Sequence, residues 1–284
     1  MVWVEIKVTL ASELVDPTSY LFNKYGTGLV TQQLNDNMIE CTTYVLKSNK
    51  TELNQIDVGL GLLKKILPVF SLKKRFVKET DWKEYWKQHF KILHISSNLI
   101  IQPSWLSKKS HLNQTSIIID PGLAFGTGHH PTTLMCLELL EKCAKSFNSL
   151  LDLGTGSGIL AITAAKLGID NIIALDTDEN SIKSAKENAK INKVSSKIDL
   201  YLGTIPDTRL HKKRFDIITA NISAEVIEEK AKTIFILLKE NGRFFAAGFM
   251  NEKAKRLKNI LLNIGFVLIK SHENGEWTTL ELSK

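Results

Sequence analysis

The feature that most limits how this chain can fold is the alternation of its segments from about Leu150 onward. Short apolar runs typical of strands alternate with longer runs whose apolar residues have helical spacing. In order, these segments are SLLDLG, SGILAITAAKLG, NIIALD, DENSIKSAKENAKIN, KIDLYLG, FDIITANI, SAEVIEEKAKTIFILLK, GRFFAAGFM, NEKAKRLKNILLNIG, FVLIKSHENG and EWTTLELSK. The pattern predicts an α/β domain with a parallel, doubly wound sheet covered by helices on both faces. A short turn at Asn274 and Gly275 predicts that the last two strands pair antiparallel.

The pattern of residues 1–80 predicts a separate, smaller domain. Alternation in VWVEIKVTL and the runs GLVTQQL, MIECTTYVLK and LKKRFVKE indicate strands. Helical spacing is found from Ser12 to Tyr25 and in QIDVGLGLLKKILPVF, although Gly59 and Gly61 lower the helix propensity of the second segment. The resulting order, β-α-β-β-α-β, is that of a ferredoxin-like module.

A helix that links the two domains is predicted over residues 81–98, and residues 99–284 form the larger domain. The linker contains an aromatic stripe at helical spacing, which we interpret as a packing surface rather than as an aromatic cage for a ligand. Its members are Trp82, Tyr85, Trp86, His89 and Phe90.

Composition excludes several classes of protein. No apolar run approaches the ~18 residues that a membrane span needs, and Glu5 and Lys7 interrupt the N-terminal segment, so we expect neither a signal peptide nor a membrane partner. Cys41, Cys136 and Cys143 are too few and too scattered for a disulfide framework or a metal site. We therefore expect a cytoplasmic protein, and a monomer.

The net charge of +7 is a mild bias toward acidic or nucleic-acid partners. Most lysines are dispersed along predicted helices, as in residues 183–193, which is typical of a solvated helix face. Charge alone does not predict an RNA-binding protein.

The strongest motif is a Gly-rich turn, DLGTGSG, between a predicted strand and a predicted helix. Gly154 and Gly156 allow a tight turn and a close approach of a ligand to the backbone, and the N–H groups at the helix start attract an anionic group. A dinucleotide enzyme would have the spacing GxGxxG, but here Ile159 stands in place of the third glycine. The spacing GxGxG, preceded by Asp152, favours S-adenosylmethionine (SAM) as the cofactor.

A carboxylate ends the next predicted strand. Asp176 lies where a side chain with two oxygens can accept hydrogen bonds from both hydroxyls of a ribose. Asp178, two residues further on, is predicted to be the N-cap of the following helix. The alternative for Asp176 is a cap or turn residue.

The third segment is the loop DPGLAFGTGHHPTT, residues 120–133, before a predicted helix. Thr132 or Thr133 is expected to cap that helix. His129 and His130 are adjacent, but no partner set of metal ligands accompanies them, so we expect no metal site.

The fourth segment is FDIITANISA, in which Asn221 ends a predicted strand. Ligands of open parallel sheets bind at the carboxyl ends of the strands, so Asn221 is expected to face the cofactor. Its amide offers both a donor and an acceptor, and a turn-forming role is the alternative.

Together these segments resemble the PrmA-type methyltransferases, the bacterial enzymes that modify the eleventh protein of the large ribosomal subunit. The loop DPGLAFGTGHHPTT is the most specific part of the resemblance, and the upstream TDWKEYW and NLIIQPSW also match in order. By motif the resemblance covers residues 79–284, and residues 1–80 match in the order of their elements.

The resemblance implies a class I SAM-dependent methyltransferase with a seven-stranded, Rossmann-like sheet. It implies that the ferredoxin-like domain recognises the ribosomal protein, and that lysine ε-amines and the N-terminal α-amine of that protein are methylated, with S-adenosylhomocysteine as the product. The cofactor contacts of the family fall on Thr133, Gly154, Asp176 and Asn221, and Gly156 belongs to the same loop. Ser223 and Thr155 depart from the family, which usually has Leu and Cys at these positions.

Two other functions remain open at this point. One is an RNA methyltransferase on the same fold, which the net charge allows and which would need stacking aromatics on a basic face. The other is a SAM-binding regulator without catalysis, against which Thr133 and Asn221 argue. A lysine with a pKa near ~10.4 must lose a proton before it can accept a methyl group, yet no residue is identified as a general base.

Overall fold

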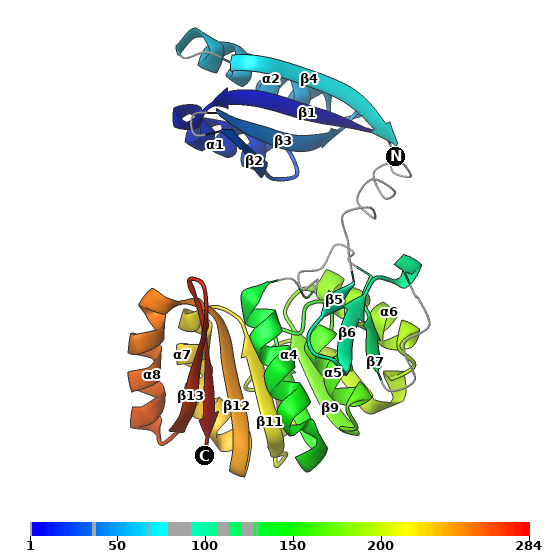
Figure 1. The fold of residues 1–284 in the computed structure, drawn as a ribbon, viewed down its shortest axis with the longest axis vertical. Coiled ribbons are helices and arrows are strands. Elements are labelled where there is room, and N and C mark those ends of the chain that lie inside the picture. The colour runs from blue at the N-terminus through cyan, green and yellow to red at the C-terminus, as the bar shows by residue number, and fades with distance from the viewer. Residues whose placement is uncertain are drawn as a thin grey trace. The chain divides into compact units, whose positions relative to one another are not determined.

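In the computed structural model the chain divides into two compact units, Met1–His89 and Phe90–Lys284 (Figure 1). The structure describes residues 2–35, 38–66, 69–78, 92–106, 114–120, 128 and 130–284. The aromatic stripe of the predicted linker helix lies outside these residues. At the described end of the predicted linker, Leu93–His94 form β5, because their backbone pairs with Ile101 and Ile100.

The first unit has the ferredoxin-like order that the sequence predicts. Its elements are β1 (Val2–Ala11), η1 (Ser12–Leu14), α1 (Val15–Tyr25), β2 (Val30–Asn35), β3 (Met38–Leu46), α2 (Lys50–Ile66) and β4 (Val69–Lys78). The sheet order is β2-β3-β1-β4, and each neighbouring pair is antiparallel. Two helices pack on one face of this sheet, as Figure 1 shows.

Glycine in α2 has a packing role that the sequence did not reveal. A Cβ at Gly59 would lie 2.6 Å from Leu21 Cδ1 of α1, so glycine is what lets the two helices approach. Ile56 and Leu60 on the inner face of α2 are buried with Phe22 of α1. This burial outweighs the low helix propensity of glycine, and α2 begins earlier than predicted.

The two faces of the small sheet differ in character. Val4, Ile6, Val8 and Leu10 of β1 face the helices and are buried, as alternation along a strand requires. On the other face Glu5 is 3% exposed and accepts hydrogen bonds from Tyr44 Oη at 2.9 Å and from Arg75 Nη2 at 3.0 Å. A buried carboxylate is tolerated there because a cation and a hydroxyl donate to it.

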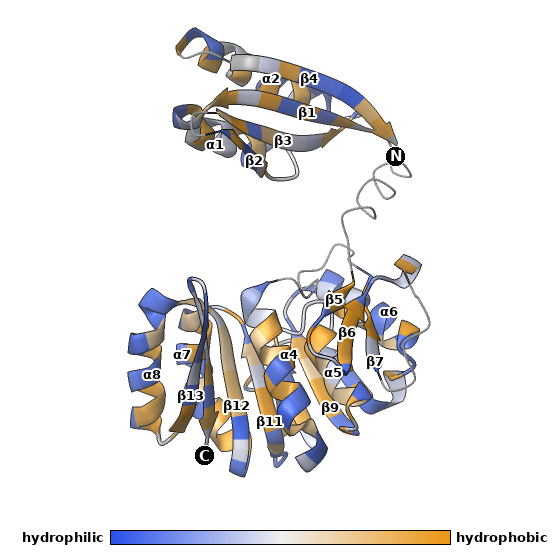
Figure 2. Cartoon of the chain, viewed as in Figure 1, coloured by the Kyte–Doolittle hydropathy of each residue, from blue (hydrophilic) through white to orange (hydrophobic). Residues whose placement is uncertain are grey.

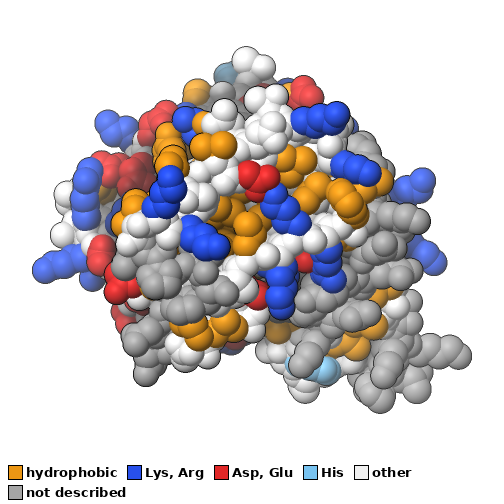
Figure 3. Space-filling model, turned by 90° about the horizontal axis from the view of Figure 1, so that it is seen from above, with side chains coloured by type: hydrophobic (Ala, Val, Ile, Leu, Met, Phe, Trp, Pro, Cys, Tyr) orange, Lys and Arg blue, Asp and Glu red, His pale blue; other side chains and the backbone are white. Residues whose placement is uncertain are grey.

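The first unit also leaves apolar side chains at its surface. Val58, Leu62 and Ile66 of α2 are 57–71% exposed and follow one face of the helix at four-residue intervals. Figure 3 shows a molecular face on which apolar side chains lie among Lys and Arg. The unit therefore offers apolar surface that its own core does not use.

The second unit is built on the predicted seven-stranded sheet. Its strands are β8 (Ser149–Leu153), β9 (Asn171–Asp176), β10 (Ile198–Leu202), β11 (Phe215–Asn221), β12 (Leu238–Met250), β13 (Val267–Asn274) and β14 (Trp277–Ser283). They are ordered β10-β9-β8-β11-β12-β14-β13. The first five strands run parallel, and β14 pairs antiparallel with β12 and β13, which confirms both predictions from the sequence.

Helices cover both faces of this sheet. They are α4 (Pro131–Cys143), α5 (Ile159–Lys166), α6 (Glu179–Ile191), α7 (Ala224–Leu237) and α8 (Asn251–Ile264), with single turns η3 (Ala144–Ser146), η4 (Ser195–Lys197) and η5 (Thr208–Leu210). Residues of α4, α5 and α6 share one core cluster with the sheet, and residues of α7 and α8 share the other. In Figure 2 the interior strand β9 is almost wholly apolar, as burial on both faces requires.

A three-stranded sheet accompanies the large one, and the apolar runs NLIIQPSW and TSIIID contain two of its strands, as their composition predicts. The strands β6 (Leu99–Gln102) and β7 (Thr115–Ile118) pair parallel, β5 pairs antiparallel with β6, and the turn η2 (Ser104–Leu106) follows β6. Leu99, Ile101 and Ile117 are buried in the same core cluster as α4 and α5. No helix in the described part of the chain has the length and apolar character that a membrane crossing needs.

Candidate functional site

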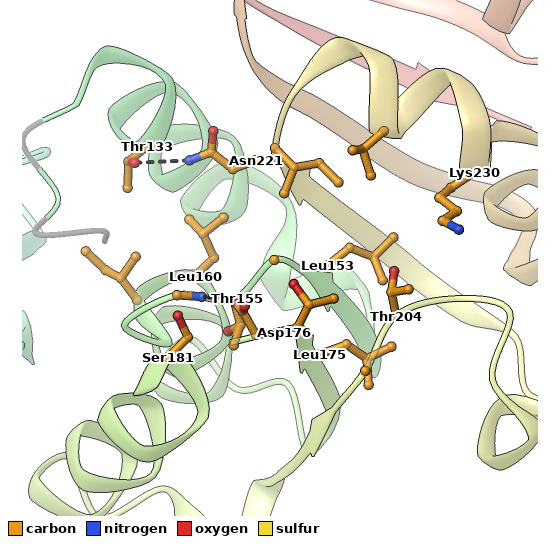
Figure 4. Close-up of a pocket in the computed structure, with 17 residues that line it drawn as sticks. Thr133, Leu153, Thr155, Leu160, Leu175, Asp176, Ser181, Thr204, Asn221 and Lys230 are labelled. Carbon is orange, nitrogen blue, oxygen red and sulfur yellow. Dashed lines mark hydrogen bonds between the residues drawn. The ribbon is translucent and has the colours of Figure 1, made fainter. Parts of the chain in front are cut away.

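A pocket of about 340 Å³ opens at the carboxyl ends of the parallel strands, where ligands of open α/β sheets bind. All five residues that the sequence predicted to contact the cofactor line it, namely Thr133, Gly154, Gly156, Asp176 and Asn221. Figure 4 shows Thr133 and Lys230 on opposite sides of the pocket. The fold therefore brings together segments from α4, the Gly-rich turn, and the ends of β9 and β11.

The Gly-rich turn is held against the neighbouring strand by its backbone. The N–H groups of Gly154 and Thr155 both donate to the carbonyl oxygen of Leu175, at 2.9 and 3.0 Å. Gly154 has φ +71°, and a Cβ there would lie 2.3 Å from Ile222 Cγ2. Glycine is therefore required at this position both by the backbone conformation and by the approach of Ile222.

Asp176 connects the turn to the next helix. Its Oδ2 accepts from Gly156 N at 2.8 Å and its Oδ1 accepts from Asp178 N at 3.0 Å. A carboxylate oxygen has a second lone pair, so both oxygens keep capacity to accept from a ligand. Asp178 is the N-cap of α6, as predicted, because its side chain accepts from Asn180 N at 3.0 Å.

Asp152 supports the turn from beneath. It is 1% exposed and accepts from Thr155 Oγ1 at 2.7 Å and from Thr219 Oγ1 at 2.6 Å, and it is not among the described residues that line the pocket. Burial raises the pKa of its carboxyl group, while the hydrogen bonds from Thr219 and Thr155 oppose that rise. Asp152 therefore engages donors of the protein rather than the pocket.

This burial predicts a pH dependence of stability. Because the pKa of Asp152 is raised in the folded state, the folded chain binds this proton more tightly than the unfolded chain does. The contribution of Asp152 to the free energy of unfolding is therefore lost as pH rises from the usual pKa of 3.8 toward the raised value. We expect the free energy of unfolding of wild type, relative to Asp152→Asn, to fall over that interval, as measured by urea unfolding at several pH values. Parallel curves would contradict the expectation.

The start of α4 differs from the prediction. Neither Thr132 nor Thr133 is the N-cap: His130 is, with extended backbone, and Pro131 follows at the first helical position. Both threonines are 1% exposed, and their hydroxyls are used elsewhere. Thr132 Oγ1 lies 2.7 Å from His130 Nδ1, and Thr133 Oγ1 accepts from Asn221 Nδ2 at 3.1 Å.

His130 also meets an aromatic side chain. Its ring lies edge-on to Trp277, with 4.3 Å between the ring centroids, and burial lowers the pKa of His130, which favours the neutral ring. Residues 121–127 and His129 of the same loop lie outside the described residues.

Several lining residues were missed from the sequence. Gly203 and Thr204 follow β10, and the rule that ligands bind at strand ends could have identified them. Val226 and Lys230 lie four residues apart on α7 and so share a helix face. Lys230 pairs with Glu229 at 2.8 Å. Nothing in the sequence distinguishes this lysine from those of a solvated helix.

The pocket suits SAM. Its volume lies in the range of roughly 300–1,000 Å³ that small-molecule sites have. A ribose needs a carboxylate with free acceptor capacity, which Asp176 supplies, and an adenine needs apolar walls, which Leu160, Leu175 and Val226 supply. Gly154 itself lines the pocket, and the side chain of Ile222, which also lines it, leaves no room for a Cβ at this position. The residues present therefore fit this cofactor.

Comparison with known proteins identifies the family. A family model described as "Ribosomal protein L11 methyltransferase (PrmA)" matches residues 2–284. A ribosomal protein L11 methyltransferase from Herpetosiphon aurantiacus is 32% identical over 312 residues, which cover 98% of this chain and 97% of the relative. One from Staphylococcus carnosus is 33% identical over 303 residues, which cover 97% and 96%.

A solved structure agrees with these relatives. The crystal structure of ribosomal protein L11 methylase from Lactobacillus delbrueckii subsp. bulgaricus matches with a TM-score of 0.61 and 31% identity, and it covers 69% of this chain and 99% of that chain. With a family model that spans almost every residue and relatives that align along nearly their whole length, the chain belongs to the ribosomal protein L11 methyltransferases, a family of SAM-dependent enzymes.

Proposed function

We propose that this chain transfers methyl groups from SAM to amines of ribosomal protein L11, namely lysine ε-amines and the N-terminal α-amine. The observation that carries the proposal is the hydrogen bond between Asn221 and Thr133 in the wall of the pocket (Figure 4). It fixes a side-chain amide at the carboxyl end of β11, with its oxygen left as an acceptor for an amine. Relatives named for L11 methylation, aligned over almost the whole chain, support the protein substrate.

The reaction needs a neutral amine held in line with the methyl group. When bound, SAM supplies a methyl group on a positively charged sulfur, which an amine lone pair can attack with release of the thioether. The apolar side chain of Ile222, which follows Asn221 and lines the pocket, disfavours a buried ammonium and so favours loss of the proton. Positioning of the two reactants can lower the activation barrier by ~7–11 kcal/mol. We assign the positioning of the amine to Asn221.

Asn221→Ala tests this assignment. We expect kcat to fall by roughly 100-fold, the size of effect that misplacement by about 1 Å can have. Thr133→Val keeps the shape of the side chain but removes the acceptor for the Asn221 amide, so kcat is expected to fall in the same direction by less. Steady-state kinetics with L11, together with calorimetric SAM affinity, measure both. Wild-type turnover and affinity in Asn221→Ala would refute the role.

We assign substrate recognition to the predicted domain at residues 1–80, catalysis to residues 99–284, and the connection to the residues between them. The exposed apolar stripe of Val58, Leu62 and Ile66 supports a binding role for the first domain. Every described residue that lines the pocket belongs to the second unit, which supports this division of roles. We further propose that the enzyme acts in the cytoplasm as a monomer.

A labelled-methyl assay tests the function as a whole. Purified enzyme and labelled SAM are mixed with unmethylated L11 and, separately, with ribosomal RNA, with Asp176→Ala as the control. We expect label on L11 that is lost in the control. Label on RNA alone would keep the fold and the cofactor but overturn the protein substrate.

A further inference from the structure

One face of α6 runs from the cofactor pocket to the three-stranded sheet of β5, β6 and β7. Ser181, Ala185, Asn188 and Asn192 follow each other at helical spacing, and each is 6% exposed or less. Ser181 lines the pocket, and the Cβ of Ala185 lies 3.0 Å from the position that a Cβ on Gly158 would take. The N-terminal part of this face, at Ser181 and Ala185, thus lies next to the pocket and the Gly-rich turn.

Asn188 joins two segments that are distant in the sequence. Its Nδ2 donates to the carbonyl oxygen of Ser157 at 2.9 Å, and its Oδ1 accepts from Asp120 N at 3.0 Å. Ser157 belongs to the Gly-rich turn, and Asp120 begins the segment that leads to Thr133. Asn188 is 1% exposed and lies outside the set of described residues that line the pocket, so any effect on the cofactor passes through these two segments.

Asn192 makes a similar set of hydrogen bonds, but none of those described involves the Gly-rich turn. Its Oδ1 accepts from Ile118 N at 2.9 Å, and its Nδ2 donates to the carbonyl oxygens of Ile118 and Asn188. Since residues 118 and 120 point their N–H groups to the same edge of β7, the two amides pair with that edge as a neighbouring strand would. Both side chains are buried. Asn192 bonds to Ile118 of β7 and Asn188 bonds to Asp120 just after it, but only Asn188 also bonds to Ser157.

We propose that Asn188 is a positioning residue for the cofactor: it sets the distance between the Gly-rich turn and the start of the segment at Asp120, and thereby the shape of the SAM pocket. An amide is suited to this task because it donates to a carbonyl and accepts from an N–H at the same time. Alanine would take away the partner that each of these two backbone groups has in Asn188, and a backbone group that loses its partner away from water costs more than an ordinary hydrogen bond contributes. The proposal rests on SAM binding in this pocket.

The test compares Asn188→Ala with the matched variant Asn192→Ala. We expect both to lower the melting temperature to a similar extent, because each removes a hydrogen-bonding partner from the backbone of β7 or of the residues that follow it. Only Asn188→Ala is expected to raise the Kd for S-adenosylhomocysteine, by about tenfold, as measured by calorimetry. In kinetics the KM for SAM should rise while the KM for L11 stays within about twofold of wild type.

A third variant separates the two bonds of Asn188. Asn188→Asp keeps the size of the side chain and the acceptor for Asp120 N, but it cannot donate to Ser157 O, so we expect a Kd close to that of Asn188→Ala. If Asn188→Ala does not fold, Asn188→Asp alone decides between a wild-type and a raised Kd. Equal Kd values for wild type, the Asn188 variants and Asn192→Ala would overturn the proposal. Failure of wild type to bind S-adenosylhomocysteine would instead overturn the proposed function.

Discussion

Asp176→Ala is expected to raise the Kd for SAM by at least about 100-fold. Hydrogen bonds to a charged group contribute about 1.5–3 kcal/mol each, and a ribose can donate two of them to this carboxylate. The substitution also frees Gly156 N and Asp178 N, which the carboxylate holds at 2.8 and 3.0 Å. Loss of the ligand contact and loss of the preformed turn act in the same direction, so this is the largest effect on binding that we expect.

Asp178→Ala is the matched control for this experiment. Asp178 lies two residues away and caps α6 through Asn180 N. Its loss should cost about 1 kcal/mol of stability, the usual cost of an N-cap, while the Kd for SAM stays within about threefold of wild type. Calorimetric titration gives both affinities, and thermal unfolding gives both stabilities. If the two variants lose affinity equally, Asp176 acts only by ordering the start of α6.

Gly154→Ala is expected to have the second large effect, on both stability and binding. The backbone at φ +71° costs a residue with a Cβ roughly 1–2 kcal/mol. The Cβ would also lie 2.3 Å from Ile222 Cγ2 in a packed region, where overpacking costs about 1–3 kcal/mol. At roughly 2–4 °C per kcal/mol the melting temperature should fall by about 5–15 °C. Because Gly154 lines the pocket, SAM affinity should fall with it.

Gly168→Ala isolates the backbone part of that effect. Gly168 has φ +109°, and no described atom lies within 4 Å of a Cβ placed there. Its variant should lose stability through backbone strain alone and keep SAM affinity. In Gly154→Ala the added substitution Ile222→Ala should recover part of the lost melting temperature, since it removes the close contact. A Gly154→Ala protein as stable as wild type would show that the turn can move to another conformation.

The sequence predicted most of the fold because the relevant signals are local. Helical spacing, two-residue alternation and turn residues each act over a few positions, and together they predicted the parallel sheet and its antiparallel end. The same holds for Gly154 and Asp176, since the turn and the end of the next strand are adjacent in any parallel sheet of this kind. The roles of loop side chains depend less on their sequence neighbours. Thr132 and Thr133 were expected to cap α4, but their hydroxyl groups instead form hydrogen bonds with His130 and Asn221.

The contacts that were missed depend on partners far along the chain. The Thr133–Asn221 bond joins residues 88 apart, and its existence follows from the order of the strands rather than from either segment. Asn188 lies in a stretch whose lysines indicate a solvated face, yet it is buried, because its amide pairs with the backbone of Ser157 and of Asp120, just after β7. Gly59 was interpreted as a weak point in α2, and only the position of Leu21 shows its use.

The place of β14 inside the large sheet has a consequence for how the enzyme is made. β14 lies between β12 and β13. Until residues 277–283 have left the ribosome, β12 is paired on one side only, with β11, and β13 has no partner strand. The nascent chain thus carries an open sheet edge at β12 until that moment, and the pairing of Phe249 with Thr278 closes it. A chain that ends before Trp277 keeps this edge open, and an open edge can pair with the strand of another chain.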